Sequence, residues 1–190
     1  LIVVTRDAVM AVPVPRSVYD DLATGGSPIG WHMRQMMQSS IQTLWQRVNL
    51  TGSDKRRQLL PERCDKEWFV RTFCDGVAGA AACPVDKPIW PFIKNLHMSD
   101  PVALIAAIPD LRQRFLKPKV VSVDSSVGRT EHLIIGASET DRGVARVDAL
   151  RAFLLNSIDN GIALSEQHAT PLVIISDPGQ DQDDEMALIM

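Results

Sequence analysis

The sequence predicts an α/β protein, and three observations support this fold class. Apolar runs typical of β-strands occur at residues 1–5, 119–123, 132–136 and 172–176. Segments whose apolar residues recur every three or four positions, as in amphipathic helices, occur at residues 29–48, 100–116 and 144–158. A cluster of carboxylates directly follows the last apolar run. Open α/β sheets gather their ligands at this end of their strands.

The first half of the chain predicts one strand, two helices and several irregular segments. Residues 1–14 are expected to be extended, ending at Pro13 and Pro15, and residues 20–28 read as a loop around Gly25 and Gly26. The helix predicted over 29–48 carries one apolar face, which we interpret as core packing: Met33, Met37, Ile41, Leu44, Trp45 and Val48. A solvated loop, a second helix and an irregular connection are predicted to follow over residues 49–64, 65–80 and 78–91.

The second half predicts a helix, two strands and a second amphipathic helix. Asp100 followed by Pro101 is a good helix start, as N-cap and first helical residue of a helix over 100–116. Residues 118–137 predict two strands around a turn, and 144–158 predict a helix. Asn160-Gly161 is read as the stop signal of that helix.

Composition indicates a globular protein of ordinary charge. The 190 residues are 45% hydrophobic and 23% charged, with a formal net charge of -3. Neither a basic tract nor an apolar run of membrane-spanning length is present, so nucleic acid and membrane are not expected as partners. Without a basic, signal-like N-terminal segment, we expect a cytoplasmic protein.

The three cysteines do not form a zinc pattern. Cys64, Cys74 and Cys83 are separated by ten and nine residues, and no Cys-x-x-Cys or histidine cluster accompanies them. We interpret them as free thiols. A disulfide among them remains the alternative in an oxidising compartment.

The carboxylate cluster is the strongest chemical signal in the sequence. Asp177, Asp181, Asp183 and Asp184 lie after an apolar run and a Pro-Gly turn, and they would repel one another without a cation. A hard cation with oxygen ligands is the simplest neutraliser. The alternative, an acidic loop that caps a helix, gains roughly 0.3–1 kcal/mol per favourable acid. It explains one or two carboxylates and not four.

Two other interpretations of the acidic motif are weaker. An EF-hand loop needs Gly at its sixth position and Glu at its twelfth, and this pattern fails from either Asp177 or Asp181. A phosphatase-type Asp-x-Asp directly after a strand would need an acid at position 179, which is Gly179.

The acidic motif resembles the N-terminal signature of the nucleoside hydrolase family, of the inosine-uridine-preferring N-ribohydrolase type. The signature Asp-x-Gly-x-Asp-x-Asp-Asp-x-x-Ala-Leu is matched by Asp177, Gly179, Asp181, Asp183, Asp184, Ala187 and Leu188. The resemblance implies that Asp177 and Asp184 bind calcium and that Asp183 is the general base. Asp181 belongs to a longer variant of the motif and is carried over as a further metal ligand.

A second segment resembles the family's C-terminal motif, His-Asp-Pro-x-Ala. Here it reads Ser99-Asp100-Pro101-Val102-Ala103, and the resemblance implies that Asp100 is another calcium ligand. The family's histidine, which assists departure of the base, is Ser99 here, and His97 lies two residues earlier. The fold implied is an open, mostly parallel, Rossmann-like sheet with flanking helices, present only in part.

The two motifs occur in the reverse of the family's order. Residues 1–158 resemble the C-terminal half of one unit, 159–170 a linker, and 171–190 the first strand and Asp-rich loop of a second or permuted unit. A junction of a tandem protein, a fragment of a larger protein and a circular permutant would each give this order. We favour the tandem-type fragment, in which Asp100 and the Asp177 cluster serve different units.

The resemblance implies hydrolysis of the N-glycosidic bond of ribonucleosides, as in purine and pyrimidine salvage. A calcium-bound water would be activated by Asp183. The alternatives are a non-catalytic nucleoside-hydrolase-like unit for assembly or ligand binding, and a carboxylate-metal hydrolase of the phosphatase type. The expected partners are a nucleoside and the rest of the fold, supplied by the same or another chain, with a homo-oligomer as one option.

Overall fold

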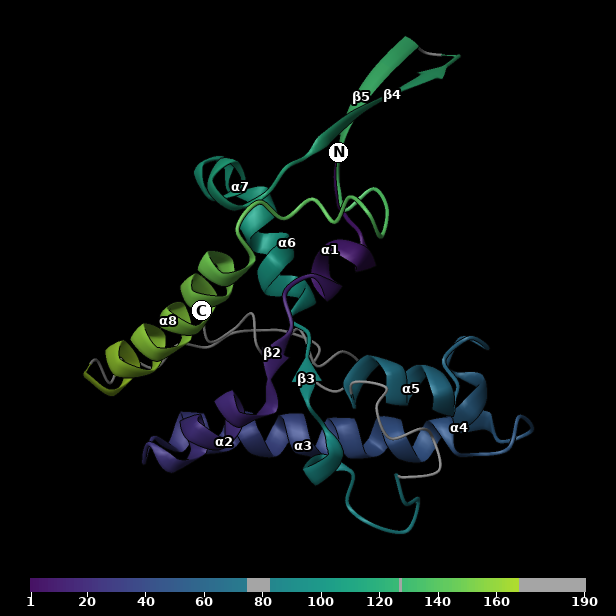
Figure 1. The fold of residues 1–190 in the computed structure, drawn as a ribbon, viewed down its shortest axis with the longest axis vertical. Helices are drawn as coiled ribbons and strands as arrows, with labels where there is room; N and C mark the ends of the chain where they lie inside the picture. The colour runs from purple at the N-terminus through teal and green to yellow at the C-terminus, as the bar shows by residue number, and fades with distance from the viewer. Residues whose placement is uncertain (75–82, 127, 168–190) are drawn as a thin grey trace. The chain divides into compact units, whose positions relative to one another are not determined.

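The chain has an α/β fold, as the sequence predicts. A computed structural model describes residues 1–74, 83–126 and 128–167 (Figure 1). The chain divides into two compact units. The first contains Leu1–Val14 and the described residues from His97 onward, and the second is Pro15–Leu96.

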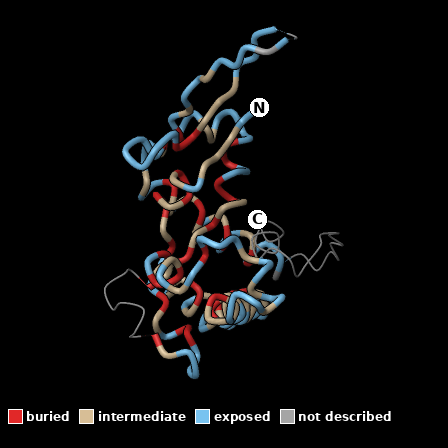
Figure 2. The backbone as a smooth tube through the Cα atoms, turned by 90° about the vertical axis from the view of Figure 1, so that its right-hand side faces the viewer, coloured by how far each residue is buried: buried red, intermediate tan, exposed pale blue. Residues whose placement is uncertain are grey.

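The first unit contains a mixed three-stranded sheet with the order β1-β5-β4. Strand β1 (Ile2–Val4) lies parallel to β5 (Gly128–Ile135), with Val3 opposite Ile134. Strand β4 (Lys119–Ser125) runs antiparallel to β5 along its whole length. Because β1 reaches only the last residues of β5, the far end of the β4–β5 hairpin pairs with nothing else in the described sheet and is exposed (Figure 2).

Strand β1 leads directly into a short helix, whereas the sequence predicted extended structure throughout residues 1–14. Helix α1 (Arg6–Met10) begins after Thr5 and carries Asp7 in its first turn, where a negative charge suits the helix dipole. Its buried face, Ala8 and Val9, is held by tertiary packing. A five-residue helix leaves almost no periodic signal in a sequence, which explains why the prediction was wrong.

The helix predicted over residues 100–116 is two helices. Helix α6 (Ser99–Ala107) ends at Ile108, and α7 (Pro109–Phe115) starts at the next residue. Ile108 adopts an extended conformation with ψ 116°. A proline disfavours the helical conformation of the residue before it, so Pro109 ends one helix and opens the next.

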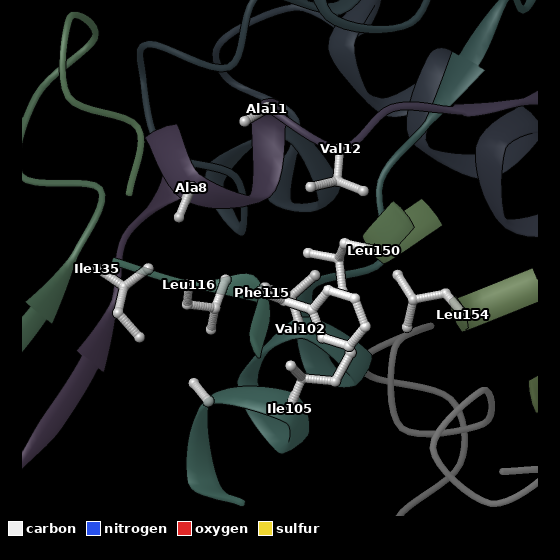
Figure 3. Packing of buried hydrophobic residues seen from close by; sticks show 11 residues of the cluster. Ala8, Ala11, Val12, Val102, Ile105, Phe115, Leu116, Ile135, Leu150 and Leu154 are labelled. Carbon is white, nitrogen blue, oxygen red and sulfur yellow. The ribbon is translucent and has the colours of Figure 1, made fainter. Parts of the chain in front are cut away.

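An apolar cluster holds the first unit together. Its buried residues come from α1, α6, α7, β5, α8 and the residues that directly follow α1 and α7: Ala8, Ala11, Val12, Val102, Ile105, Ala106, Phe115, Leu116, Ile135, Leu150 and Leu154. Figure 3 shows them packing together. Phe115 also packs on Phe153, with 5.2 Å between the ring centroids. These residues come from both ends of the described chain, so the cluster joins segments that are distant in sequence.

The last described helix is longer than predicted. Helix α8 (Val147–Gln167) passes through Asn160 and Gly161, where it was predicted to end. A glycine in a helix costs about 1 kcal/mol relative to alanine. Burial of Ile158 and Ile162 on either side of Gly161 offsets that cost.

The second unit is mainly helical. Its helices are α2 (Arg16–Thr24), α3 (Pro28–Val48), α4 (Lys55–Gln58) and α5 (Lys66–Phe73), followed by the 3-10 turn η2 (Trp90–Phe92). Strand β3 (Asn95–Leu96) pairs with β2 (Val14–Pro15) in a two-stranded sheet. None of the helices in the parts of the chain that the structure describes is long and apolar enough to span a membrane.

Helix α3 confirms the predicted helix and its apolar face. Five of the six predicted positions are buried, and Leu44 is half-buried. The aromatic ring of Trp45 lies 4.9 Å from that of Phe69 on α5. Helix α2, in contrast, covers most of the predicted loop over 20–28. Its buried Tyr19 and its close approach to Gly30 of α3 stabilise it there.

We expect Leu154→Ala to lower the free energy of unfolding by about 2–5 kcal/mol, because it leaves a cavity in the apolar cluster. Leu154 is 0% exposed, whereas Leu164, on the same helix, is 55% exposed. Leu164→Ala is therefore the matched control, with an expected change within about 0.5 kcal/mol. Urea denaturation followed by circular dichroism measures both. Equal losses would contradict the placement of α8 against the cluster.

Candidate functional site

The carboxyl ends of β1 and β5 meet in the first unit. The N–H of Thr5 donates to the carbonyl of Ile135 over 3.0 Å, and its hydroxyl donates to the carbonyl of Gly136. Because the two strands are parallel, both end at the same edge of the sheet. Ligands of open α/β folds bind outside this edge. We therefore take this edge as the candidate site.

Two glycines fix the loop that leaves β5 at this edge. Gly136 has a φ of +78°, and a Cβ placed there would lie 2.5 Å from Oγ1 of Thr5 and 2.6 Å from the N atom of Ala8. Gly143 has a φ of +67°, and a Cβ there would lie 2.4 Å from the N atom of Gly136. Only glycine fits either position without moving backbone. The exposed residues 137–142 thus form a loop whose two ends touch.

Asp100 lies in the first turn of α6, which packs against both β1 and α1. The structure places Met98 at the N-cap and Ser99 at the first helical position, so the prediction of Asp100 as N-cap is wrong by two residues. Proline is tolerated in the first turn, where backbone N–H groups have no partner within the helix, and the helix can therefore start before Pro101. Asp100 is half-buried, as are Ser99 and His97.

The described residues do not by themselves fit a calcium ion. Calcium takes six to eight oxygen ligands. Within residues 1–74, 83–126 and 128–167, no three His, Cys, Asp or Glu side chains are grouped closely enough to hold a metal. Asp100 is one carboxylate. The other predicted ligands and the predicted base, Asp177, Asp181, Asp183 and Asp184, lie outside the described residues.

Thr5 and Asp7 were not predicted to be site residues. Thr5 joins the ends of β1 and β5, and Asp7 is a half-buried carboxylate in the first turn of α1. Their position in the sequence could have identified them, because both closely follow the apolar run at the start of the chain. Polar residues in this position commonly face the ligand edge of a sheet.

In the second unit, a polar network surrounds Trp90. The indole N–H donates to the carboxylate of Asp20 over 3.0 Å, and the Arg34 guanidinium lies over the ring at 5.2 Å from its centroid. Asp20 also pairs with Arg16 and Arg34, each at 3.4 Å. Trp90 is only 3% exposed, which confirms that it is a packed residue and not a surface on which a base could stack.

Two arginines of the basic segment Lys55-Arg56-Arg57 in the second unit make hydrogen bonds to nearby residues. Arg56 makes two hydrogen bonds to the carboxylate of Asp54, the N-cap of α4, and Arg57 donates to the carbonyls of Leu60 and Glu62. The Asp54 pairing lowers the pKa of that carboxyl, chiefly through the hydrogen bond from Arg56. Residues 49–64 are mostly exposed, as predicted, but Lys55–Gln58 form helix α4, so the prediction of a loop is wrong there.

A polar cavity of about 450 Å³ lies between α3 and residues 85–88 of the second unit. Glutamines on one face of α3 form its floor: Gln35, Gln38, Gln42 and Gln46. Asp86 and Lys87 are the charged residues in the part of the lining that the structure describes. Among its described lining residues, one carboxylate is fewer than the acid–base pair that hydrolysis of a glycosidic bond requires.

Comparison with known structures shows which proteins share this fold. The chain is 24% identical to the effector protein XOO4466 and 25% identical to the type III effector protein XopQ, solved in complex with adenosine diphosphate ribose. Each match has a TM-score of 0.55 and covers 82% of this chain and 38% of the effector. This chain shares the fold of XopQ-type effectors. It spans well under half of their length.

The fold of these effectors is nucleoside-hydrolase-like, and this chain shares part of that fold. The sequence matches no protein-family profile and no curated protein. Assignment to the nucleoside hydrolase family itself, and to its inosine-uridine-preferring members, is wrong, because the structures that the chain matches are effector proteins. A short acidic motif is too little to assign a family, because proteins with the same fold carry out many different functions.

We expect Gly136→Ala to destabilise the protein by more than about 1 kcal/mol, because the strained backbone and the clash with Thr5 and Ala8 add together. Gly52→Ala is the control, since a Cβ at Gly52 meets nothing within 4 Å. Chemical denaturation of the two variants side by side provides the measurement. If Gly136→Ala proved as stable as Gly52→Ala, the described contact between β1 and the loop after β5 would be wrong.

Proposed function

We propose that the protein containing this chain binds a ribose-containing nucleotide of the ADP-ribose class through its nucleoside-hydrolase-like unit. One observation carries this proposal: the chain shares its fold, over 82% of its length, with XopQ, a protein solved with ADP-ribose. The comparison is consistent with a small-molecule ligand.

The candidate site supplies chemistry suited to a ribosyl group. A carboxylate accepts hydrogen bonds from a ribose diol, as acidic residues do at the ligand edge of dinucleotide-binding folds. Asp100 is a half-buried carboxylate on a helix that packs against β1. Partial burial strengthens such a hydrogen bond, because the surrounding dielectric is lower than in water. Asp100 is therefore the described residue that we assign to the ligand.

We expect Asp100→Asn to weaken ADP-ribose binding by about ten-fold or more, since a hydrogen bond to a charged group contributes roughly 1.5–3 kcal/mol. Asp110→Asn is the matched control. Asp110 also lies in the first turn of a helix next to a proline, but it is exposed. Isothermal titration calorimetry with ADP-ribose gives the dissociation constants. Equal affinities for the two variants would remove Asp100 from the site.

A second candidate function is hydrolysis of the N-glycosidic bond of ribonucleosides, and the acidic motif of residues 177–188 favours it. The motif offers one carboxylate as a base and others as oxygen ligands, and a divalent ion such as calcium suits that set. Ser99 stands where the resembling enzymes carry the histidine that assists the leaving base. This substitution favours ligand binding over turnover.

If the protein is a hydrolase, Asp183→Ala should abolish release of ribose from a nucleoside, because it removes the carboxylate assigned to take the proton from the attacking water. The assay measures reducing sugar with calcium present, and again after chelation with EDTA. Asp110→Asn should retain the activity. Ribose release by Asp183→Ala would contradict the base assignment, and phosphate release from a phosphomonoester would point to a phosphatase. ADP-ribose binding without any release supports the first proposal alone.

A further inference from the structure

Two buried cysteines face each other in the second unit. Cys74 is the C-cap residue of α5, and Cys83 lies nine positions later. Their Sγ atoms are 3.9 Å apart, and the residues are only 5% and 2% exposed. A disulfide bond is about 2.05 Å long. The remaining gap is of the size that rotation about the two Cα–Cβ bonds can close.

Hydrogen bonds hold the backbone beside each cysteine. The N–H of Lys94 donates to the carbonyl of Phe73 over 2.8 Å, which ties the end of α5 to the segment before β3. The indole N–H of Trp45 donates to the carbonyl of Pro84 over 3.2 Å, which ties the residue after Cys83 to α3. The backbone next to each cysteine is therefore held in place by hydrogen bonds, and these bonds keep the two sulfur atoms close together.

The surroundings of the pair do not suit a catalytic thiol. A reactive cysteine is partly exposed and electropositive, with a depressed pKa. Burial, together with the neighbouring Cys83, instead raises the pKa of Cys74 to about 12. The charge of Lys94 acts in the opposite direction and is the weakest of these effects. At neutral pH Cys74 is thus a neutral thiol beside a second sulfur.

We propose that Cys74 and Cys83 are a redox pair that forms a reversible intramolecular disulfide, linking the end of α5 to the segment that leads into η2. Cys64, the third cysteine, remains a thiol. Nothing in the proposed nucleotide-binding role requires this bond, so the inference stands apart from it.

The oxidant is a low-molecular-weight disulfide such as oxidised glutathione. One cysteine thiolate attacks a sulfur of glutathione disulfide, that S–S bond breaks, and one glutathione leaves as a thiolate that takes up a proton. The second cysteine then attacks the mixed disulfide and releases the second glutathione. The two cysteine thiols together lose two electrons and two protons. Glutathione disulfide takes up these electrons and protons and becomes two molecules of reduced glutathione.

The test is oxidation of the purified wild-type protein with glutathione disulfide at pH 7, 8 and 9. Free thiols are then alkylated, and the disulfide is mapped by peptide mass spectrometry. We expect a Cys74–Cys83 link with Cys64 alkylated. Formation should become faster as pH rises, because the thiolate is the attacking species. Closing so short a loop should raise the Tm by about 5 °C or more. Dithiothreitol should reverse the rise.

Single-cysteine variants supply the controls. Cys64→Ser should oxidise like the wild type, whereas Cys74→Ser and Cys83→Ser should form no internal link. Circular dichroism checks that each variant is folded. Because the link is mapped in the wild type, the result does not depend on the variants folding. A link through Cys64, glutathione retained on Cys74 or Cys83 as a mixed disulfide, or no oxidation at all would overturn the proposal.

Discussion

The parallel pairing of β1 with β5 is the constraint on which the first unit depends. Val3 lies opposite Ile134, so two segments separated by most of the described chain share one ladder. A parallel pair cannot be joined by a tight turn and needs a long crossover. Here the crossover includes the whole second unit, α6, α7 and β4. This pairing places β5 beside β1, and both the apolar cluster and the candidate site are built from residues that it brings together.

The elements that were predicted from the sequence are those whose stability comes from a repeating pattern. Helix α3 carries buried residues at helical spacing over its whole length, so its face and its end at Val48 were predicted. The β4–β5 hairpin was predicted from two apolar runs around a glycine turn. Helices α1 and α2 were missed because each depends on a few tertiary contacts, such as those of Ala8 and Tyr19, which no local pattern records. The break at Pro109 was missed because the apolar spacing continues across it.

The site was predictable only in part, for a related reason. Asp100 was identified from a short motif, and it lies in the first turn of α6 instead of at its predicted N-cap position. Thr5 and Asp7 acquire their significance from the sheet edge at which they lie, and this edge exists only once β1 has paired with β5. Asp177, Asp181, Asp183 and Asp184 remain sequence-level predictions. The comparison with XopQ-type effectors corrects the family and retains the fold.

The contact between Gly136 and Gly143 has a consequence for how this protein tolerates change. The two glycines close the base of the loop, and the backbone of residues 143–145 is held by an N–H from Lys117 and a carbonyl from Phe115. The exposed residues between the glycines make only short-range turn contacts with one another, such as those of Ser138 and Asp141. Insertions and new side chains at the tip of this loop therefore leave the sheet unstrained. The tip is a position where homologous proteins can diverge in length and chemistry beside a constant scaffold.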